Sequence, residues 1–237
     1  MAISHSPRIV RDGLVLALDA ADRNSYPGTG TAWYDLSGNG YNGTLTNGPT
    51  YSSNSIVLDG ANDYIATSSA NTLGNLSNHT FEIWFKTQGL GTSQTEGGLV
   101  CPDYGMISTI DANGKVRYSI YSTDNGAPGS GGAYLGFITA TGVSVFDDEW
   151  HHVVCTCQLN GSLYIYIDGT LQTSGGSIGS WSGSTIWSNM STSIGRNPNN
   201  TPYNFYGNIA STKIYTKYFT ASEVLQNYNA TKTRFGL

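Results

Sequence analysis

Aromatic residues within polar segments are the side chains of this sequence best suited to binding a small molecule. Trp181 and Trp187 lie among serines and glycines, and Tyr203 and Tyr206 lie in or directly after an asparagine-rich segment, residues 197–205. Aromatic rings stack on the C–H surfaces of sugars, while amides and hydroxyls match sugar hydroxyl groups. The pattern therefore predicts a carbohydrate site that includes these rings. The alternative is that each ring covers one end of a hydrophobic core.

Trp84 is a further candidate for stacking on a sugar. Residues 81–86 alternate in the period of two that is typical of a strand with one buried face. An outward tryptophan on this strand either forms a ligand platform or lies beneath a loop, and both alternatives stay open. The expected inward residues are Phe81, Ile83 and Phe85, and the expected outward residues are Glu82, Trp84 and Lys86.

Asp35 and Asn39 suggest a loop that binds calcium. Together with Ser37 they place oxygen atoms at the first, third and fifth positions of a loop whose sixth residue is Gly40, as in the first half of an EF-hand loop. The twelfth position is Thr46, however, where such loops have glutamate. We therefore favour the alternative that Asp35 and Asn39 bond their own backbone in Asx turns. We expect no required cofactor.

The acidic residues do not form a catalytic pattern. Glycoside hydrolysis needs two carboxylates that face one cleft about 5–10 Å apart. The dense acidic group, residues 147–149, lies at a turn, and Glu82 is alone on its strand. His151 and His152 are adjacent and so face opposite sides of a strand, which makes it hard for them to share a metal. The sequence predicts a protein that is not an enzyme.

A predicted hairpin, residues 150–171, organises the elements around these side chains. Its first strand alternates so that Val153, Cys155 and Cys157 share one side. Asn160 with Gly161, and then Asp168 with Gly169, supply turns because these residues tolerate positive φ angles. Further strands are expected at residues 13–18, 104–110, 115–121, 134–139, 142–146 and 208–215. Thr220 and Glu223 form a capping box that predicts a short helix extending through Tyr228.

Composition limits the class of partner. The chain has 237 residues, of which 11% are charged, a net charge of −5 and no cluster of lysine or arginine. Nucleic acid and anionic membrane surfaces are therefore not expected partners. Apolar runs are much shorter than the roughly 20 residues that span a bilayer. The three cysteines do not suggest a disulfide framework, and the first residues do not resemble a signal peptide, so we expect synthesis in a reducing cytoplasm.

Three groups of motifs occur in the order found in the laminin-G-like, concanavalin A-like superfamily, and the chain resembles that superfamily from about Gly13 onward. They are residues 18–20, 33–43 and 57–64; residues 150–171, with Trp-His-His-Val and Leu-Tyr-Ile-Tyr-Ile-Asp-Gly; and residues 193–196, 205–209 and 213–215. The resemblance implies an all-β fold, a two-sheet antiparallel β-sandwich or jelly roll with a short C-terminal helix. We expect residues 1–12 to be an N-terminal arm and residues 13–237 to be the domain.

The resemblance also implies function. Many family members carry an acidic residue that helps to bind calcium at the position occupied here by Ala210, and this departure further weakens the calcium hypothesis. Stand-alone domains of this kind resemble tailed-bacteriophage proteins that decorate the virion head or tail and contact glycans or the host surface. The alternative is a purely structural subunit that binds a capsid or tail, or assembles with itself, through protein contacts made by residues 1–12.

Overall fold

A computed structural model describes residues 8–67, 78–91, 95–102, 106–121, 134–158, 161–175, 192–197 and 203–237. Within these residues the chain is mostly β-structure, and the strands of every sheet pair antiparallel. The predicted fold class, an antiparallel β-sandwich with a short C-terminal helix, is confirmed. No helix in the part of the chain described is long and apolar enough to cross a membrane.

The first layer is an eight-stranded sheet, here called the large sheet, in the order β15-β14-β13-β7-β19-β5-β4. The ten-residue strand β19 pairs with β7 on one side, and on the other side it pairs with β1 along one half and β5 along the other. The strands are β1 (Leu14–Asp19), β4 (Thr50–Ser52), β5 (Ser55–Asp59), β7 (His79–Lys86), β13 (His151–Cys157), β14 (Leu163–Ile167), β15 (Thr170–Gly175) and β19 (Tyr206–Tyr215).

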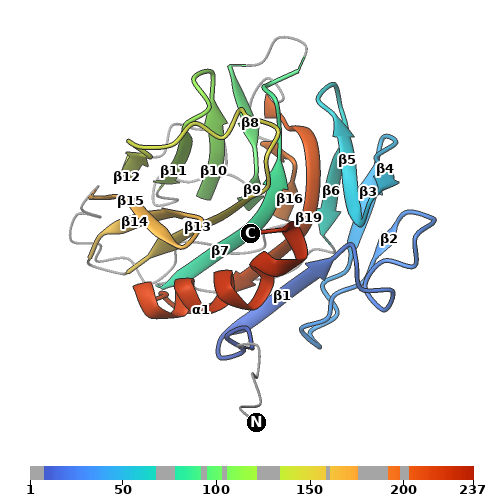
Figure 1. Ribbon diagram of the computed structural model, residues 1–237, viewed down its shortest axis with the longest axis horizontal. Helices are drawn as coiled ribbons and strands as arrows, with labels where there is room; N and C mark the ends of the chain where they lie inside the picture. Colours follow the sequence, from blue (N-terminus) through green and yellow to red (C-terminus); the bar gives the residue numbers. More distant parts are fainter. Residues whose placement is uncertain are drawn as a thin grey trace.

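Two smaller sheets form the second layer (Figure 1). A two-stranded hairpin lies against β8 and β9. The four-stranded sheet contains β8 (Glu96–Gly98), β10 (Met106–Asp111), β11 (Val116–Tyr121) and β12 (Tyr134–Thr139). The five-stranded sheet contains β2 (Ala32–Trp33), β3 (Gly43–Thr46), β6 (Tyr64–Thr67), β9 (Val100–Pro102) and β16 (Thr192–Ile194). The hairpin pairs β17 (Arg196–Asn197) with β18 (Tyr203–Asn204). One apolar cluster, with residues from all three sheets, fills the space between the layers.

The predicted central hairpin is present as β13 and β14. Val153, Cys155 and Cys157 point into the core between the layers, as their alternation predicts. Both thiols are buried and unpaired, and burial raises the pKa of Cys157 to about 12, so these residues act as small apolar side chains. Asp168 and Gly169 have φ angles of 53° and 76° and form the second predicted turn. Asn160, in the first turn, lies outside the described residues.

The expected strand over residues 142–146 is wrong. Phe146 makes an isolated bridge to Thr87, and the rest of this segment lies outside any strand. Its backbone bonds elsewhere, because the Val145 N–H donates to the Gly114 carbonyl at 2.9 Å and the Val143 N–H donates to the side chain of Gln172. A segment whose donors serve a turn and a side chain cannot also form a ladder.

The C-terminal helix covers the outer face of the large sheet, the face that points away from the core (Figure 1). It comprises α1 (Ala221–Thr231) and the 3-10 turn η1 (Lys232–Phe235). The predicted capping box is confirmed, because the Glu223 N–H donates to Thr220 Oγ1 at 3.3 Å and the Thr220 N–H donates to Glu223 Oε2 at 2.9 Å. These two bonds fix the start of the helix.

Charged and polar side chains are buried beneath α1. Lys213 Nζ lies 2.6 Å from Glu82 Oε1, and Asn227 donates to Glu82 Oε2 and to the Tyr215 hydroxyl. Burial alone would raise the pKa of Glu82, but the charge of Lys213 and the adjacent His152 outweigh it and hold that pKa well below its usual range. Glu82 therefore stays ionised inside the protein.

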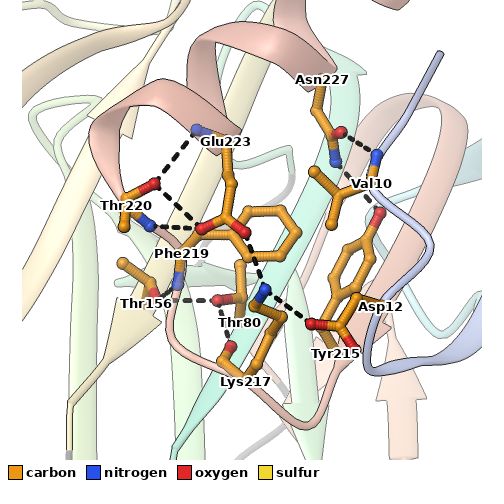
Figure 2. Close-up of polar contacts among 10 residues, drawn as sticks. All are labelled: Val10, Asp12, Thr80, Thr156, Tyr215, Lys217, Phe219, Thr220, Glu223 and Asn227. Carbon is orange, nitrogen blue, oxygen red and sulfur yellow. Dashed lines mark hydrogen bonds and ion pairs between the residues drawn. The ribbon is translucent and has the colours of Figure 1, made fainter.

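Residues 8–12 lie against this helix (Figure 2). The Val10 N–H donates to Asn227 Oδ1 at 2.7 Å, and Gln226 donates to the Arg8 carbonyl at 2.7 Å. Asp12 pairs with Lys217 at 2.8 Å. This part of the predicted arm therefore binds the domain's own helix, whereas residues 1–7 lie outside the described residues.

Candidate ligand-binding rim

The structure describes two of the four aromatic residues that the polar segments single out. Trp181 and Trp187 lie outside the described residues. Tyr203 is half-buried in β18, and Tyr206, the first residue of β19, is 40% exposed. The described candidates therefore lie at one end of the sandwich, where β18 leads into β19.

The backbone of Tyr206 is fixed while its ring stays accessible. Tyr206 pairs with Asp59 of β5, and Thr87 Oγ1 donates to the Tyr206 carbonyl at 2.6 Å. The ring belongs to a residue held by two neighbouring strands rather than to a free loop. Its position before binding is therefore close to its position after binding, which lowers the entropic cost of stacking.

Two glycines make room for Tyr206. Gly60 and Gly91 have φ angles of 75° and 70°, which favour glycine. A Cβ atom at Gly60 would lie 2.9 Å from the Cβ of Tyr206, and one at Gly91 would lie 3.2 Å from it. Larger residues at either position would displace the tyrosine.

The adjacent turn between β5 and β6 is held by its own acidic side chains. Asp59 Oδ1 accepts the Ala61 N–H at 2.8 Å, and Asp63 Oδ2 accepts the Asp59 N–H at 3.2 Å. Burial raises the pKa of Asp63, and the charge of Asp59 adds to this, against the lowering effect of the bond from the Asp59 N–H. Asn204 donates to the Ala61 carbonyl and ties the β17–β18 hairpin to this turn.

An arginine and a second tyrosine complete this end of the molecule. The Arg196 guanidinium carbon lies 4.8 Å from the ring centre of Tyr64, and Arg196 pairs with Asn204 across the hairpin. We call residues 59–64, Arg196, Tyr203 and Tyr206 the rim. The rim combines aromatic rings with a guanidinium group and the exposed backbone of a turn, groups that can stack on a ring and bond to hydroxyls.

Trp84 does not form a ligand platform. It points away from the core, as its alternation predicts, but it is fully buried under the C-terminal helix. Its ring centre lies 4.1 Å from that of Phe235 and 5.9 Å from that of Tyr228, and its Nε1 donates to Thr231 Oγ1 at 2.9 Å. The proposed role of Trp84 in sugar stacking is therefore wrong, because α1 and η1 occupy the place of a ligand.

Asp35 uses its carboxylate to hold its own loop. Oδ1 accepts the N–H groups of Ala17 and Ser37, both at 2.9 Å, and Oδ2 accepts the Ser37 hydroxyl at 2.7 Å and the Tyr41 N–H at 3.1 Å. The predicted Asx turn at Asp35 is present. Asn39 makes no such turn; its amide donates to the Val15 carbonyl at 3.1 Å. Both carboxylate oxygens of Asp35 are thus committed to its own loop, and none of the described residues form a metal-binding cluster.

His151 is held between two carboxylates. Its Nδ1 lies 2.8 Å from Asp168 Oδ2 and its Nε2 lies 3.1 Å from Asp147 Oδ1. Burial alone would lower the pKa of His151, but the hydrogen bonds and charges of Asp168 and Asp147 raise it above its ordinary value. An imidazole with both nitrogens occupied serves as a tether between loops. His152 faces the other side of β13, 3.3 Å from Glu82, so the two histidines do not act together.

Comparison with protein families shows which family the chain belongs to. Residues 59–225 match the model of the concanavalin A-like lectin/glucanases superfamily. The chain belongs to this superfamily. A comparison with curated proteins finds no match.

Solved structures of the same fold are binding domains of bacterial toxins. The botulinum neurotoxin serotype D binding domain is similar with a TM-score of 0.67 and 18% identity, over 92% of this chain and 52% of that chain. The binding domain of Paraclostridial mosquitocidal protein 1 gives a TM-score of 0.65 and 18% identity, over 93% and 52%. A serotype D ligand-binding domain in complex with N-acetylneuraminic acid gives 0.67 and 17%, over 92% and 51%. The chain spans about half the length of these structures, and identities this low show a shared fold.

Sequence reasoning missed Arg196 and Gly91 at this end of the molecule. Arg196 belongs to the family motif at residues 193–196, but the motif gives it no role. Gly91 lies in a polar loop with no local signal beyond its being a glycine. Arg196 meets Tyr64, and Gly91 lies against Tyr206, across more than a hundred residues of sequence, so spacing along the chain could not reveal these contacts.

Proposed function

We propose that this chain is a non-catalytic binding domain that attaches to glycans or to a host surface through the rim. The observation that carries the proposal is the 40% exposed ring of Tyr206 on a backbone fixed by Asp59 and Thr87. Arg196 and Tyr64, which contact each other elsewhere on the rim, supply donors and a second ring. A preorganised ring next to polar groups suits a sugar better than a flat apolar partner.

The comparisons support a binding domain rather than a catalytic one. The matched superfamily takes its name from lectins as well as glucanases, and the similar structures are binding domains, one of them in complex with a sialic acid. A fold hosts many functions, so the proposal depends on the rim residues themselves.

The biological setting we propose is the surface of a tailed-phage virion, head or tail, reached after synthesis in the bacterial cytoplasm. The resemblance of the sequence motifs to virion proteins motivates this setting. Residues 1–7 would then be the segment available to virion partners or to other copies, since residues 8–12 are bound to α1. In the alternative, the chain is a structural subunit held by protein contacts without sugar binding.

A glycan array tests the proposal directly. The purified protein is screened with calcium and with a chelator, alongside Tyr206→Ala and Tyr203→Ala. Tyr34→Ala is the matched control, because Tyr34 is 46% exposed but lies outside the rim. We expect specific binding that falls about tenfold in Tyr206→Ala and is unchanged in the control.

The outcomes separate the alternatives. Binding that Tyr206→Ala leaves intact but Trp187→Ala removes would move the site to the segment around Trp187. Loss of binding with chelator alone would restore Asp35 and Asn39 as metal ligands. An array negative in both conditions would reject the glycan proposal and favour the structural subunit.

A further inference from the structure

A lysine, a glutamate and an asparagine from three different elements meet beneath α1. Lys213 of β19 and Glu82 of β7 are direct cross-strand partners, so their side chains project to the same side of the large sheet. That side is the outer one, and α1 contributes Asn227, one of its two buried residues. None of the three belongs to the rim, so this cluster is a separate feature of the molecule.

The carboxylate of Glu82 holds both side-chain nitrogens. Lys213 Nζ lies 2.6 Å from Glu82 Oε1, and Asn227 Nδ2 donates to Glu82 Oε2. One carboxylate thus places a primary amine, which can act as a nucleophile, beside the amide of an asparagine. When two reacting groups are held together in this way, their reaction becomes an intramolecular step that needs no encounter in solution.

The oxygen of the Asn227 amide faces a backbone donor. The Val10 N–H donates to Asn227 Oδ1 at 2.7 Å, and Asn227 Nδ2 also donates to the Tyr215 hydroxyl at 3.0 Å (Figure 2). A backbone N–H directed at a carbonyl oxygen stabilises the negative charge that develops there when a nucleophile adds to the carbon. The surroundings of this amide therefore supply what acyl transfer requires, a nucleophile, a carboxylate and an oxyanion donor.

Water has little access to the cluster. Glu82 and Asn227 have no exposed surface, and Lys213 is 6% exposed. Val154 pairs with Glu82 on the side away from Lys213, and it belongs to an apolar cluster with Val224 of α1. Exclusion of water removes the competing nucleophile, so the amine is the group best placed to attack the amide carbon.

We propose that Lys213 and Asn227 form an intramolecular isopeptide bond, with Glu82 as the catalytic base and acid. Glu82 Oε1 takes a proton from the Lys213 ammonium, and the lone pair of Nζ attacks Cγ of Asn227. The Val10 N–H stabilises the resulting oxyanion. Glu82 Oε2 then gives the proton to Nδ2, the Cγ–Nδ2 bond breaks and ammonia leaves.

The atoms and charges of this step balance without a co-reactant. The Cγ–Nζ bond replaces the Cγ–Nδ2 bond, and the carboxylate keeps the second proton that Nζ loses when it becomes an amide nitrogen. Glu82 is therefore neutral after the reaction, so no unpaired charge remains buried. Until the bond closes, the ion pair holds the three groups in place, and its contribution to stability is that of the unreacted protein.

The bond ties the C-terminal helix to the large sheet by a covalent link. The three cysteines all lie within the described residues, and none forms a disulfide. An isopeptide bond needs no oxidising compartment, because its formation transfers no electrons. It therefore gives this chain a permanent cross-link that can form in a reducing cytoplasm and withstand reduction outside it.

Mass spectrometry of the full chain tests the proposal. We expect the intact mass of the folded protein to be lower than the mass of its sequence by about 17 Da, the mass of one ammonia. Trypsin should release a branched peptide in which residues 197–217 are joined to residues 218–232, because it does not cleave after a lysine whose amine is acylated. Fragmentation of this peptide should place the branch at Lys213 and Asn227.

Two variants should abolish the mass loss. Lys213→Arg keeps a positive charge beside Glu82 but has no amine to attack the amide, and Glu82→Gln keeps the size of the side chain but cannot take a proton. Lys217→Arg is the matched control. Lys217 also lies 2.7 Å from a glutamate, Glu223, but this pair is partly exposed, so the control should retain the full mass loss.

Three results would overturn the proposal. The first is the unmodified mass in folded wild-type protein after prolonged incubation at neutral pH. The second is a loss of ammonia that Lys213→Arg retains, since this would arise elsewhere, as in a succinimide at an Asn-Gly pair. The third is a branched peptide that joins other residues. If either variant fails to fold, the branched peptide of the wild type decides the question alone.

Discussion

At β7 the two faces of the large sheet are both buried, but they are built differently. On the core side β7 presents Phe81, Ile83 and Phe85 to an apolar interior shared with the smaller sheets. On the other side the same strand presents Glu82 and Trp84, which α1 covers. One face is stabilised by packing of apolar groups. The other also depends on an ion pair, amide bonds and stacked rings.

The difference shows what alternation along a strand can establish. A period of two assigns side chains to faces, but it does not say whether the polar-looking face meets water. Here α1 buries few of its own residues, Val224 and Asn227, and one of these is an asparagine. A helix with so narrow an apolar stripe can pack on a sheet only because the sheet offers polar partners for it.

The largest effect is expected at Trp84. Trp84→Ala should lower the free energy of unfolding by about 4 kcal/mol, as much as Phe81→Ala on the core face, because both remove a fully buried ring. Urea denaturation measures both. Trp84→Phe keeps a ring but loses the bond to Thr231, so we expect a smaller loss of about 2 kcal/mol. A cost for Trp84→Ala below about 1 kcal/mol would mean that the helix side contributes little stability.

Lys213→Ala should lower the free energy of unfolding by about 3 kcal/mol, because it leaves Glu82 ionised and buried without its main partner. Lys217→Ala is the control. Its pairs with Asp12 and Glu223 are partly exposed, so the cost should stay below about 1 kcal/mol. Replacing both Glu82 and Lys213 by leucine should cost less than Lys213→Ala alone, since no charge is then left unpaired. A double replacement more costly than the single one would contradict this account.

Truncation at the N-terminus should distinguish residues 8–12, which contribute to stability, from residues 1–7, which do not. Deleting residues 1–12 removes the buried side chain of Val10 and the partner of Asn227 Oδ1, at a cost of about 2 kcal/mol. Deleting only residues 1–7 leaves those contacts in place and should not change thermal unfolding. The shorter deletion is therefore the proper test of virion or self-assembly contacts. Equal destabilisation by both deletions would show that residues 8–12 do not secure α1.

A smaller effect is expected at the start of α1. Thr220→Ala removes the side-chain acceptor of the Glu223 N–H and should lower stability by about 1 kcal/mol. Thr216→Ala, an exposed threonine outside the helix, should cost less than about 0.5 kcal/mol. Equal losses of stability in the two variants would mean that the Thr220 cap adds nothing to the stability of the helix.

The smallest effect that we expect is a pH dependence of stability caused by His151, at the edge of the core side of the large sheet. The pKa of His151 is raised in the folded state, so its stabilising contribution is complete below its unfolded pKa of about 6.5 and is lost as the pH rises through the folded value. The difference in melting temperature between wild type and His151→Gln should therefore be larger near about pH 5.5 than near about pH 9. Burial lowers the pKa of His79 to about 3, so below about pH 6.5 only the unfolded state takes up its proton, and His79→Gln should cost less near about pH 5.5 than near about pH 9, the opposite trend. The reverse pattern for His151 would contradict the carboxylate tether.

Local signals predicted the elements that local chemistry determines. The turn at Asp168 and Gly169, the inward cysteines and the capping box at Thr220 follow from residues close together in the chain. The burial of Trp84 did not, because the helix that covers it begins well over a hundred residues later.

The candidate sites were predictable to a smaller extent. Tyr206 was singled out from its neighbours in sequence, but Gly91 comes to it from a distant loop, and Arg196 meets Tyr64 from a distant strand. The ion pairs of Arg117 were missed altogether, since Glu96, Asp111 and Arg117 meet only across three strands. Strand register cannot be read from a single sequence with the accuracy that such a network needs.

The pairing of β1 with β19 has a consequence for synthesis on the ribosome. Leu16 and Leu18 emerge early, but the strand that pairs with β1 ends at Tyr215, and Val10 meets Asn227 across 217 positions. Until β19 and α1 have left the exit tunnel, β1 has no neighbouring strand and its leucines face solvent or a chaperone. Closure of the domain therefore waits until β1 and β19, which lie far apart in the sequence, have both been synthesised.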